Sequence, residues 1–274
     1  MNKTKKRLPA TLPAEWTSRF SLETLDLIEF RNVQHFKHSM KKLKPKPTDS
    51  SDKNCNVSFR DAVDDLVNNR ATISKGDYEV VKNAVKNVLV KKGLVSESIS
   101  EEYKYHHEGV VVDMSKVAQL DPNCFLQPVV SYENYFYELY ISMSIPYFID
   151  NSEISNSLAK IMATVELLEQ EKIYTKITMV LPVSGANDDG RETLVTIPLF
   201  GHKETKCIER MSSQLNERTL RKFYFAIVED RYKTELNENY GRIKTLPRTI
   251  AAYNIDEEEL CSEILNQTIL KGKR

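Results

Sequence analysis

The segment that most constrains the fold is an alternating run of residues, Tyr135–Ile145, which ends at Pro146. One face of this run is apolar throughout, whereas the other face also carries Glu138, Ser142 and Ser144. A period of two is typical of a β-strand, because successive side chains point to opposite faces. The sequence therefore predicts a strand over residues 135–145.

The residues after this strand alternate between helical and extended patterns. Apolar side chains recur every three or four residues from about Glu153 to Leu168, which predicts a helix. Strands are expected over 176–183 and 192–200, joined by a Gly-flanked turn. A helix over 205–215, apolar helical spacing to about residue 230, a strand over 248–255 and a terminal helix follow. This order predicts an α/β fold with a central sheet covered by helices.

The first part of the chain has a helical pattern instead. Helices are expected over 16–36, 58–68 and 77–92, the last with Gly93 at its C-terminal end. The sequence thus predicts a basic N-terminal helical segment, a linker, a helical region and an α/β sheet domain, over residues 1–44, 45–56, 57–108 and 109–274.

Several classes of enzyme are poorly supported by the motifs. The chain has eight glycines and none of the glycine-rich loops that bind dinucleotides or nucleoside triphosphates. The four cysteines lie far apart, and His35 and His38 are better explained as part of a basic helix than as metal ligands. We therefore predict no catalytic residues, no metal site, no cofactor and a non-enzymatic role. No apolar run is long enough to span a membrane.

Basic and aromatic residues provide the candidate binding site. The net charge is zero, but residues 1–60 carry 13 Lys or Arg against 6 Asp or Glu. Basic side chains track a nucleic-acid backbone and aromatic rings stack on the bases of single strands. Predicted nucleic-acid contacts are Lys41, Lys42, Lys44, Lys46, Arg221, Lys222, Tyr224, Arg231 and Tyr232.

The segment Tyr140–x–Ser142–x–Ser144 resembles the metal-site strand of von Willebrand factor A-type domains, in which an Asp precedes two Ser. The resemblance implies an A-domain-like sheet. Tyr140 stands where the carboxylate belongs, and a tyrosine hydroxyl with a pKa of about 10 does not replace that anionic ligand. The likeness therefore implies a degenerate metal site.

A second resemblance covers residues 57–230. The segments Ser58–Asn69, Val112–Phe125 and Tyr137–Gln170 are similar to those of an uncharacterised family encoded mainly by bacteriophages and prophages. The chain departs from this family at Ser115 and Lys116, where Gly and Arg are usual. The resemblance implies a phage protein that acts in the host cytoplasm.

Two functions from different classes remain. The first is an accessory protein that binds single-stranded DNA as a cofactor of transcription or replication. The alternative is an A-domain-like interaction or assembly module, whose partner is a phage or host polymerase or another protein. The sequence leaves the choice of partner and the oligomeric state open.

Overall fold

The computed structural model describes the chain from Leu12 to Leu260 with gaps. The described residues are 12–20, 25–43, 58–70, 73–95, 103–108, 111–128, 135–146, 148–184, 192–215, 222–232, 242–243 and 246–260. The predicted linker at 45–56 lies outside them, as do Lys44, Lys46 and Arg221.

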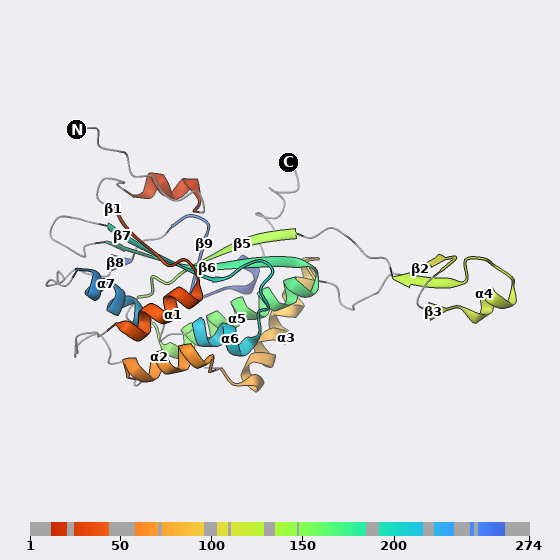
Figure 1. Ribbon diagram of the computed structural model, residues 1–274, viewed down its shortest axis with the longest axis horizontal. Helices are drawn as coiled ribbons and strands as arrows, with labels where there is room; N and C mark the ends of the chain where they lie inside the picture. The colour runs from red at the N-terminus through yellow and green to blue at the C-terminus, as the bar shows by residue number, and fades with distance from the viewer. Residues whose placement is uncertain are drawn as a thin grey trace.

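Among the described residues, a six-stranded mixed sheet forms the centre of the molecule (Figure 1). Its path runs β1-β7-β6-β5-β9, and β8 pairs with β6 beyond the end of β5. The strands are β1 (Leu25–Glu29), β5 (Tyr135–Ser142), β6 (Ile173–Ser184), β7 (Glu192–Phe200), β8 (Arg242–Ile243) and β9 (Thr249–Ala251). Strand β5 is parallel to both β6 and β9, β6 and β7 form an antiparallel hairpin, and β1 is parallel to β7.

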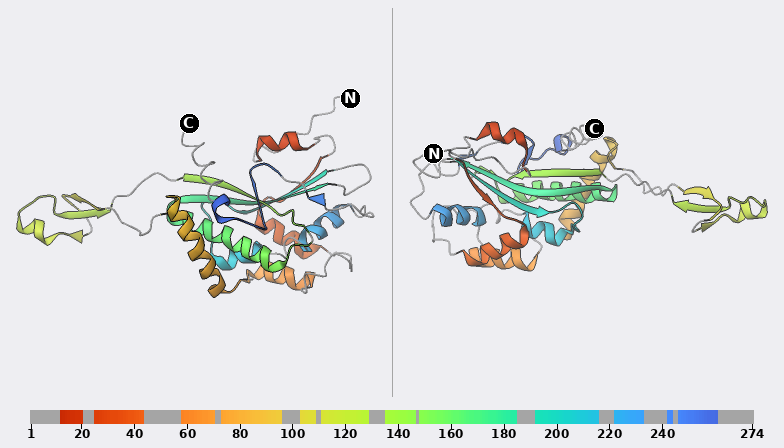
Figure 2. Two further views of the ribbon diagram at one scale, coloured as in Figure 1. Left: turned by 180° about the vertical axis from the view of Figure 1, so that it is seen from behind. Right: turned by 45° about the horizontal axis from the view of Figure 1, so that its top comes forward.

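The helices of the main body gather on one face of this sheet, as the two sides in Figures 1 and 2 show. They are α1 (Val33–Lys42), α2 (Phe59–Asn68), α3 (Lys75–Lys91), α5 (Asn151–Gln170), α6 (Ile208–Gln214) and α7 (Tyr224–Tyr232). Side-chain caps begin α2 and α3, where Ser58 and Ser74 accept from the N–H groups of Asp61 and Asp77. The predicted α/β class, with a central sheet covered by helices, is confirmed.

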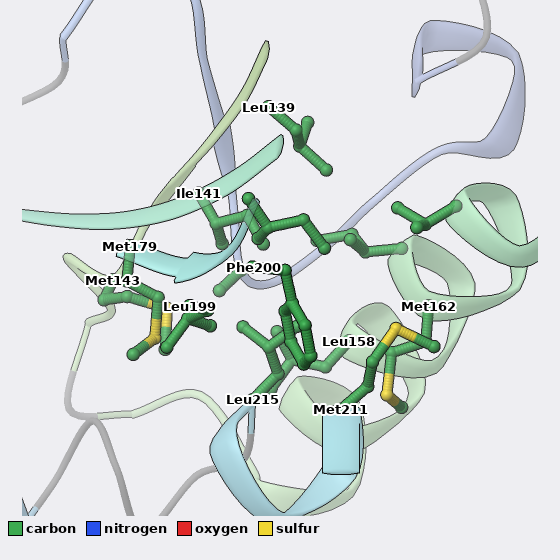
Figure 3. Packing of buried hydrophobic residues seen from close by; sticks show 14 of the residues in the cluster. Leu139, Ile141, Met143, Leu158, Met162, Met179, Leu199, Phe200, Met211 and Leu215 are labelled. Carbon is green, nitrogen blue, oxygen red and sulfur yellow. The ribbon is translucent and has the colours of Figure 1, made fainter. Parts of the chain in front are cut away.

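One apolar core joins the sheet to these helices. It contains Ile141 of β5, Leu158 of α5 and Phe200 of β7, each at most 1% exposed. Figure 3 shows Ile141 and Phe200 between the sheet and α5, with Leu158 beside Phe200. The same cluster includes Phe36, Leu66 and Leu89 of α1, α2 and α3. The N-terminal helices therefore share the core of the sheet.

A smaller cluster covers the opposite face. Trp16, in the 3₁₀ helix η1 (Ala14–Arg19), is fully buried and contacts Tyr140 edge to face, with ring centroids 5.2 Å apart. Its indole Nε1 donates to the Pro247 carbonyl at 2.8 Å. A buried indole N–H needs an acceptor, and this bond ties η1 to the residues just before β9, while the ring contact places Trp16 on β5.

The predicted helix over 16–36 is wrong. Strand β1 occupies Leu25–Glu29, and α1 begins only at Val33. Leu25 and Leu27 belong to the smaller cluster, whereas Ile28 packs against the larger one. A strand with both faces covered carries apolar residues without simple alternation, so the segment looks helical in sequence.

Residues 103–128 form a separate unit, which we call the arm. Strands β2 (Tyr103–His106), β4 (Phe125–Pro128) and β3 (Val111–Val112) make an antiparallel sheet, and α4 (Met114–Ala118) connects β3 to β4. Figures 1 and 2 show the arm to one side of the main body in every view. The β-branched run near residue 110 is therefore a strand, as expected, but it belongs to the arm and not to the central sheet.

Most of the other predicted elements are confirmed. The alternating segment forms β5, the stripe after it forms α5, and Gly93 ends the α3 region with a positive φ of 70°. Within the described residues, the helices are too short or too polar to cross a membrane.

Replacing Leu158 with alanine tests the shared core. Leu158 is 1% exposed, so Leu158→Ala is expected to lower the free energy of unfolding by about 2–5 kcal/mol. Urea unfolding followed by circular dichroism measures the change. The matched control is Val80→Ala on α3, where the side chain is 71% exposed, and its effect is expected to stay within about 0.5 kcal/mol. Equal losses in the two variants would contradict this packing.

Candidate functional site

The exposed side of α1 is strongly basic. His35, His38 and Lys42 are exposed and follow one another at intervals of three and four residues, so they line one side of the helix, with Lys41 beside them. Arg31 is also exposed and stands just before the N-cap Asn32. We call these five residues the basic face of α1. The opposite side packs into the core through Val33, Phe36 and Met40.

The local sequence holds this helix in place. Asn32 is the N-cap, and its side chain accepts from the His35 amide at 2.8 Å. Lys41 and Lys42 lie in the last turn, where positive charge also complements the helix dipole. Helix α1 itself contains no Asp or Glu, and among the described residues no carboxylate lies within ion-pair distance of Lys41 or Lys42. The basic face therefore carries uncompensated positive charge.

Lys37 belongs to the core side and not to the basic face. Its ammonium donates to the Asn69 side chain at 2.7 Å, which links α1 to the end of α2. Burial lowers the pKa of Lys37, and the nearby Arg210 guanidinium lowers it further.

The predicted contacts lie in two parts of the chain, residues 41–46 and 221–232. Helix α1 and the start of the second part do meet, but through aromatic rings. Phe36 of α1 contacts Phe223 edge to face, with ring centroids 6.0 Å apart. Lys222 and Tyr224, which flank Phe223, are only 8% and 7% exposed. A base cannot stack on a buried ring, so burial corrects the expectation that these two side chains contact nucleic acid.

Arg231 is exposed at the end of α7 and is bound to a carboxylate. Its guanidinium donates to both oxygens of Asp26 on β1, at 3.0 and 3.2 Å. This bidentate pair ties α7 to the sheet, so part of the Arg231 charge is already neutralised. Tyr232 is the last residue of α7. The predicted site therefore has Lys41 and Lys42 as its accessible, uncompensated members within the described chain.

The carboxyl end of β5 is closed. Ser142 and Ser144 are 6% and 8% exposed, and the Ser144 hydroxyl donates to the Pro182 carbonyl at 3.3 Å. The Tyr140 hydroxyl donates to Glu138, and burial together with this carboxylate raises the Tyr140 pKa. Across the described residues, no three His, Cys, Asp or Glu side chains lie close enough to hold a metal ion.

Buried charged groups elsewhere connect structural elements. The Lys206 ammonium, fully buried, contacts Glu169 at 2.5 Å and donates to the Gly201 carbonyl at 3.1 Å. Tyr78 and Lys82 of α3 both donate to Glu166 of α5 at 2.6 Å, and burial and this carboxylate raise the Tyr78 pKa. Each group has a partner in a neighbouring element, so these pairs act as links between helices and loops.

A cavity of about 240 Å³ lies along β9, between Arg248 and Leu260. It is smaller than the roughly 300–1,000 Å³ of most small-molecule sites. Arg248 contacts Glu15 at 3.4 Å, and Asp256 accepts from the amides of Glu258 and Glu259. Arg248 and Asp256 therefore have structural roles, and we assign no chemistry to the cavity.

The arm contains a compact polar network. The Tyr105 hydroxyl donates to Asp113 at 2.8 Å, and the other Asp113 oxygen caps α4 through the Ser115 amide at 2.9 Å. Hydrogen bonds from Ser115 and Tyr105 lower the pKa of Asp113 to about 2. The Lys116 ammonium lies 3.6 Å from the centroid of the Tyr105 ring and 3.1 Å from Asp121. This network holds α4 against β2.

Two sets of surface residues were missed in the sequence. The sequence shows the spacing of Arg31, His35, His38 and Lys42. The expected helix over 16–36 ends before His38 and Lys42, so the four residues were not assigned to one helix. Met114, Val117 and Leu120 recur every third residue in the arm and are exposed. Apolar spacing normally indicates a buried helix face, so only a structure distinguishes an exposed patch from a core.

Comparison with known proteins identifies the family. The family described as "Domain of unknown function (DUF7192)" matches residues 17–269. The chain belongs to this family. The DUF7192 match includes the central sheet, the basic face of α1 and the arm. No curated protein and no solved structure matches the chain.

The polar network of the arm predicts an unusually acidic aspartate. Asp113 is expected to stay mostly ionised at pH 3, where an ordinary aspartate, with a pKa of about 3.9, is mostly protonated. Because its pKa is lower in the folded arm, its stabilising effect is complete above about pH 4 and is lost as the pH falls toward 2. Carboxyl ¹³C NMR titration measures this. Tyr105→Phe removes one donor and is expected to raise the midpoint, and an unchanged midpoint near 4 in both proteins would contradict the network.

Proposed function

We propose that the chain is a non-enzymatic accessory protein, encoded by a bacteriophage, that binds single-stranded DNA in the host cytoplasm as a cofactor of transcription or replication. The basic face of α1 carries this proposal. Four of its five residues lie on the exposed side of one helix, whose other side is fixed in the core, and Arg31 stands just before the N-cap. The positive charges of Arg31, Lys41 and Lys42, carried by a helix held in place, fit a line of phosphates.

Phosphate contacts supply most of the affinity in this proposal. Tyr224 is buried, and Lys116 covers one face of the Tyr105 ring, so neither offers a fully open stacking surface. The preference for single strands rests on the aromatic–basic pattern of the sequence. Lys44 and Lys46, which follow α1 in the sequence, add two positive charges to this part of the chain.

A second function, as a protein-interaction module, is favoured by a different observation. The arm exposes Met114 and Leu120, which are 72% and 91% accessible to solvent. Apolar side chains grouped in this way mark surfaces that contact other proteins. The A-domain-like form of this proposal also has support from the central position of β5 between the parallel strands β6 and β9, with Ser142 at its carboxyl end.

Neutralising two lysines of the basic face tests the DNA proposal. The variant Lys41→Gln/Lys42→Gln is expected to weaken binding of a labelled single-stranded oligonucleotide, measured by fluorescence anisotropy from about 50 to 200 mM salt. Each phosphate contact to a single strand contributes about 0.7 to the slope of log affinity against log salt, so this slope is expected to fall by about 1.4. The loss should be similar for different base sequences, since phosphates carry no sequence information.

The chain offers a matched control at the end of α3. Lys91 and Lys92 are also consecutive, exposed and at a helix C-terminus, so Lys91→Gln/Lys92→Gln removes the same formal charge from another helix end, where Lys92 lies 3.9 Å from Glu258. This control is expected to keep the affinity and salt slope of the original chain. Equal effects of the two variants, or no binding at low salt, would contradict the proposal. Equal affinity for a duplex would contradict the preference for single strands.

A further inference from the structure

Among the arm residues whose exposure the structure describes, none forms an apolar core. No arm residue whose exposure the structure describes is buried, and α4 contributes no buried side chain. Units of fewer than about 40 residues usually need a disulfide, a metal ion or another chain to remain folded. Cys124 is the one cysteine between residues 103 and 128, so a disulfide within the arm is excluded. The arm also stands apart from the main body (Figures 1 and 2), which favours contact with another chain.

An apolar surface on the arm is available for such a contact. Met114 is 72% exposed, Val117 39% and Leu120 91%. Their spacing of three residues places them along one side of α4 and the turn that follows it. Val112, at the end of β3, is 42% exposed. We call these four residues the apolar face of the arm.

Leu120 has a backbone conformation that its residue type disfavours. Its φ is +55°, and it occupies the first position after the C-cap of α4. The Asp121 amide donates to Lys116 O and the Leu120 amide to Val117 O, the pattern of a Schellman motif, in which this position is usually glycine. A leucine that is both strained and exposed has no role in the stability of the arm alone. Strain of this kind is typical of functional positions.

The charges around the apolar face are paired within the arm. Lys116 contacts Asp121, and Asp113 accepts from Tyr105 and Ser115. The whole arm has two lysines and three acidic residues, so its formal charge is close to zero. Two copies of this surface can therefore meet around a two-fold axis without bringing unpaired like charges together.

We propose that the arm is a dimerisation element, in which the apolar face packs against the same face of a second copy of this chain. The two-fold contact buries Leu120 and Met114 of both copies and gives each arm an apolar core. Four side chains per copy cover less than the roughly 800 Å² per partner of a standard interface. The dimer is therefore weak and depends on concentration. This inference does not rest on the proposed binding of DNA.

Sedimentation velocity of the full chain over a range of micromolar concentrations tests the dimer. The sedimentation coefficient is expected to rise with concentration toward that of a dimer. Leu120→Asn is expected to raise the dimer dissociation constant about tenfold or more, because each dimer loses two buried leucines. Asparagine tolerates a positive φ, so this variant keeps or increases the thermal stability of the monomer, and unfolding does not explain the loss of association.

Two comparisons keep the outcome unambiguous. Leu120→Gly also removes the side chain and relieves the backbone, so it is expected to act like Leu120→Asn. Val80→Asn removes an apolar side chain that is 71% exposed on α3 and is expected to leave the dimer intact. EDTA is expected to have no effect.

Three results would overturn the proposal. The chain could remain monomeric at all concentrations, which would assign the apolar face to a different protein. Dimerisation could persist unchanged in Leu120→Asn, which would place the interface elsewhere. Loss of the dimer in EDTA would indicate assembly through a metal ion.

Discussion

The packing of β5 against α5 is the interaction on which the rest of the structure depends. Ile141 and Leu158 belong to one buried cluster, and the helix connects β5 to its parallel neighbour β6. A parallel pair needs a crossover of this kind, and the helix must cover the sheet to bury its own apolar side. The sheet continues on both sides of β5, with β9 on one side and the β6–β7 hairpin on the other.

The packing of the sheet against the helices also determines which side chains are exposed on the surface. Strand β1 pairs with β7 and is followed closely by α1. The side of α1 that carries Phe36 therefore packs into the core, where Phe36 contacts Phe223. The basic residues are left on the other side of the helix. The arm is arranged differently, because its polar groups are paired internally while its apolar groups face solvent. The main body therefore offers charge and the arm offers apolar contact, and these are separate surfaces.

Sequence patterns predict the elements whose two faces differ. Strand β5 and helix α5 follow from periodicity, because the apolar residues recur with a period of two in the strand and of three or four in the helix. Strand β7 is covered on both faces and follows from its run of β-branched and apolar residues. The pattern fails in β1, where Leu27 and Ile28 pack on opposite faces of a half-buried strand, and in the arm, where the apolar residues of α4 are exposed. Site residues were harder to predict, since the charge of Lys222 and the ring of Tyr224 say nothing about burial. Only tertiary packing places these two residues inside and leaves Lys41 and Lys42 outside.

A single core that joins β1 and α1 to the central sheet has a direct test in native-state hydrogen exchange. If the core is shared, the slowest amides of α1 and β1 will open with the same free energy as those of β5 and β6, because they unfold together. Exchange of α1 and β1 at much lower free energy than the sheet, as a separate unit, would contradict the shared core and the fixed position of the basic residues.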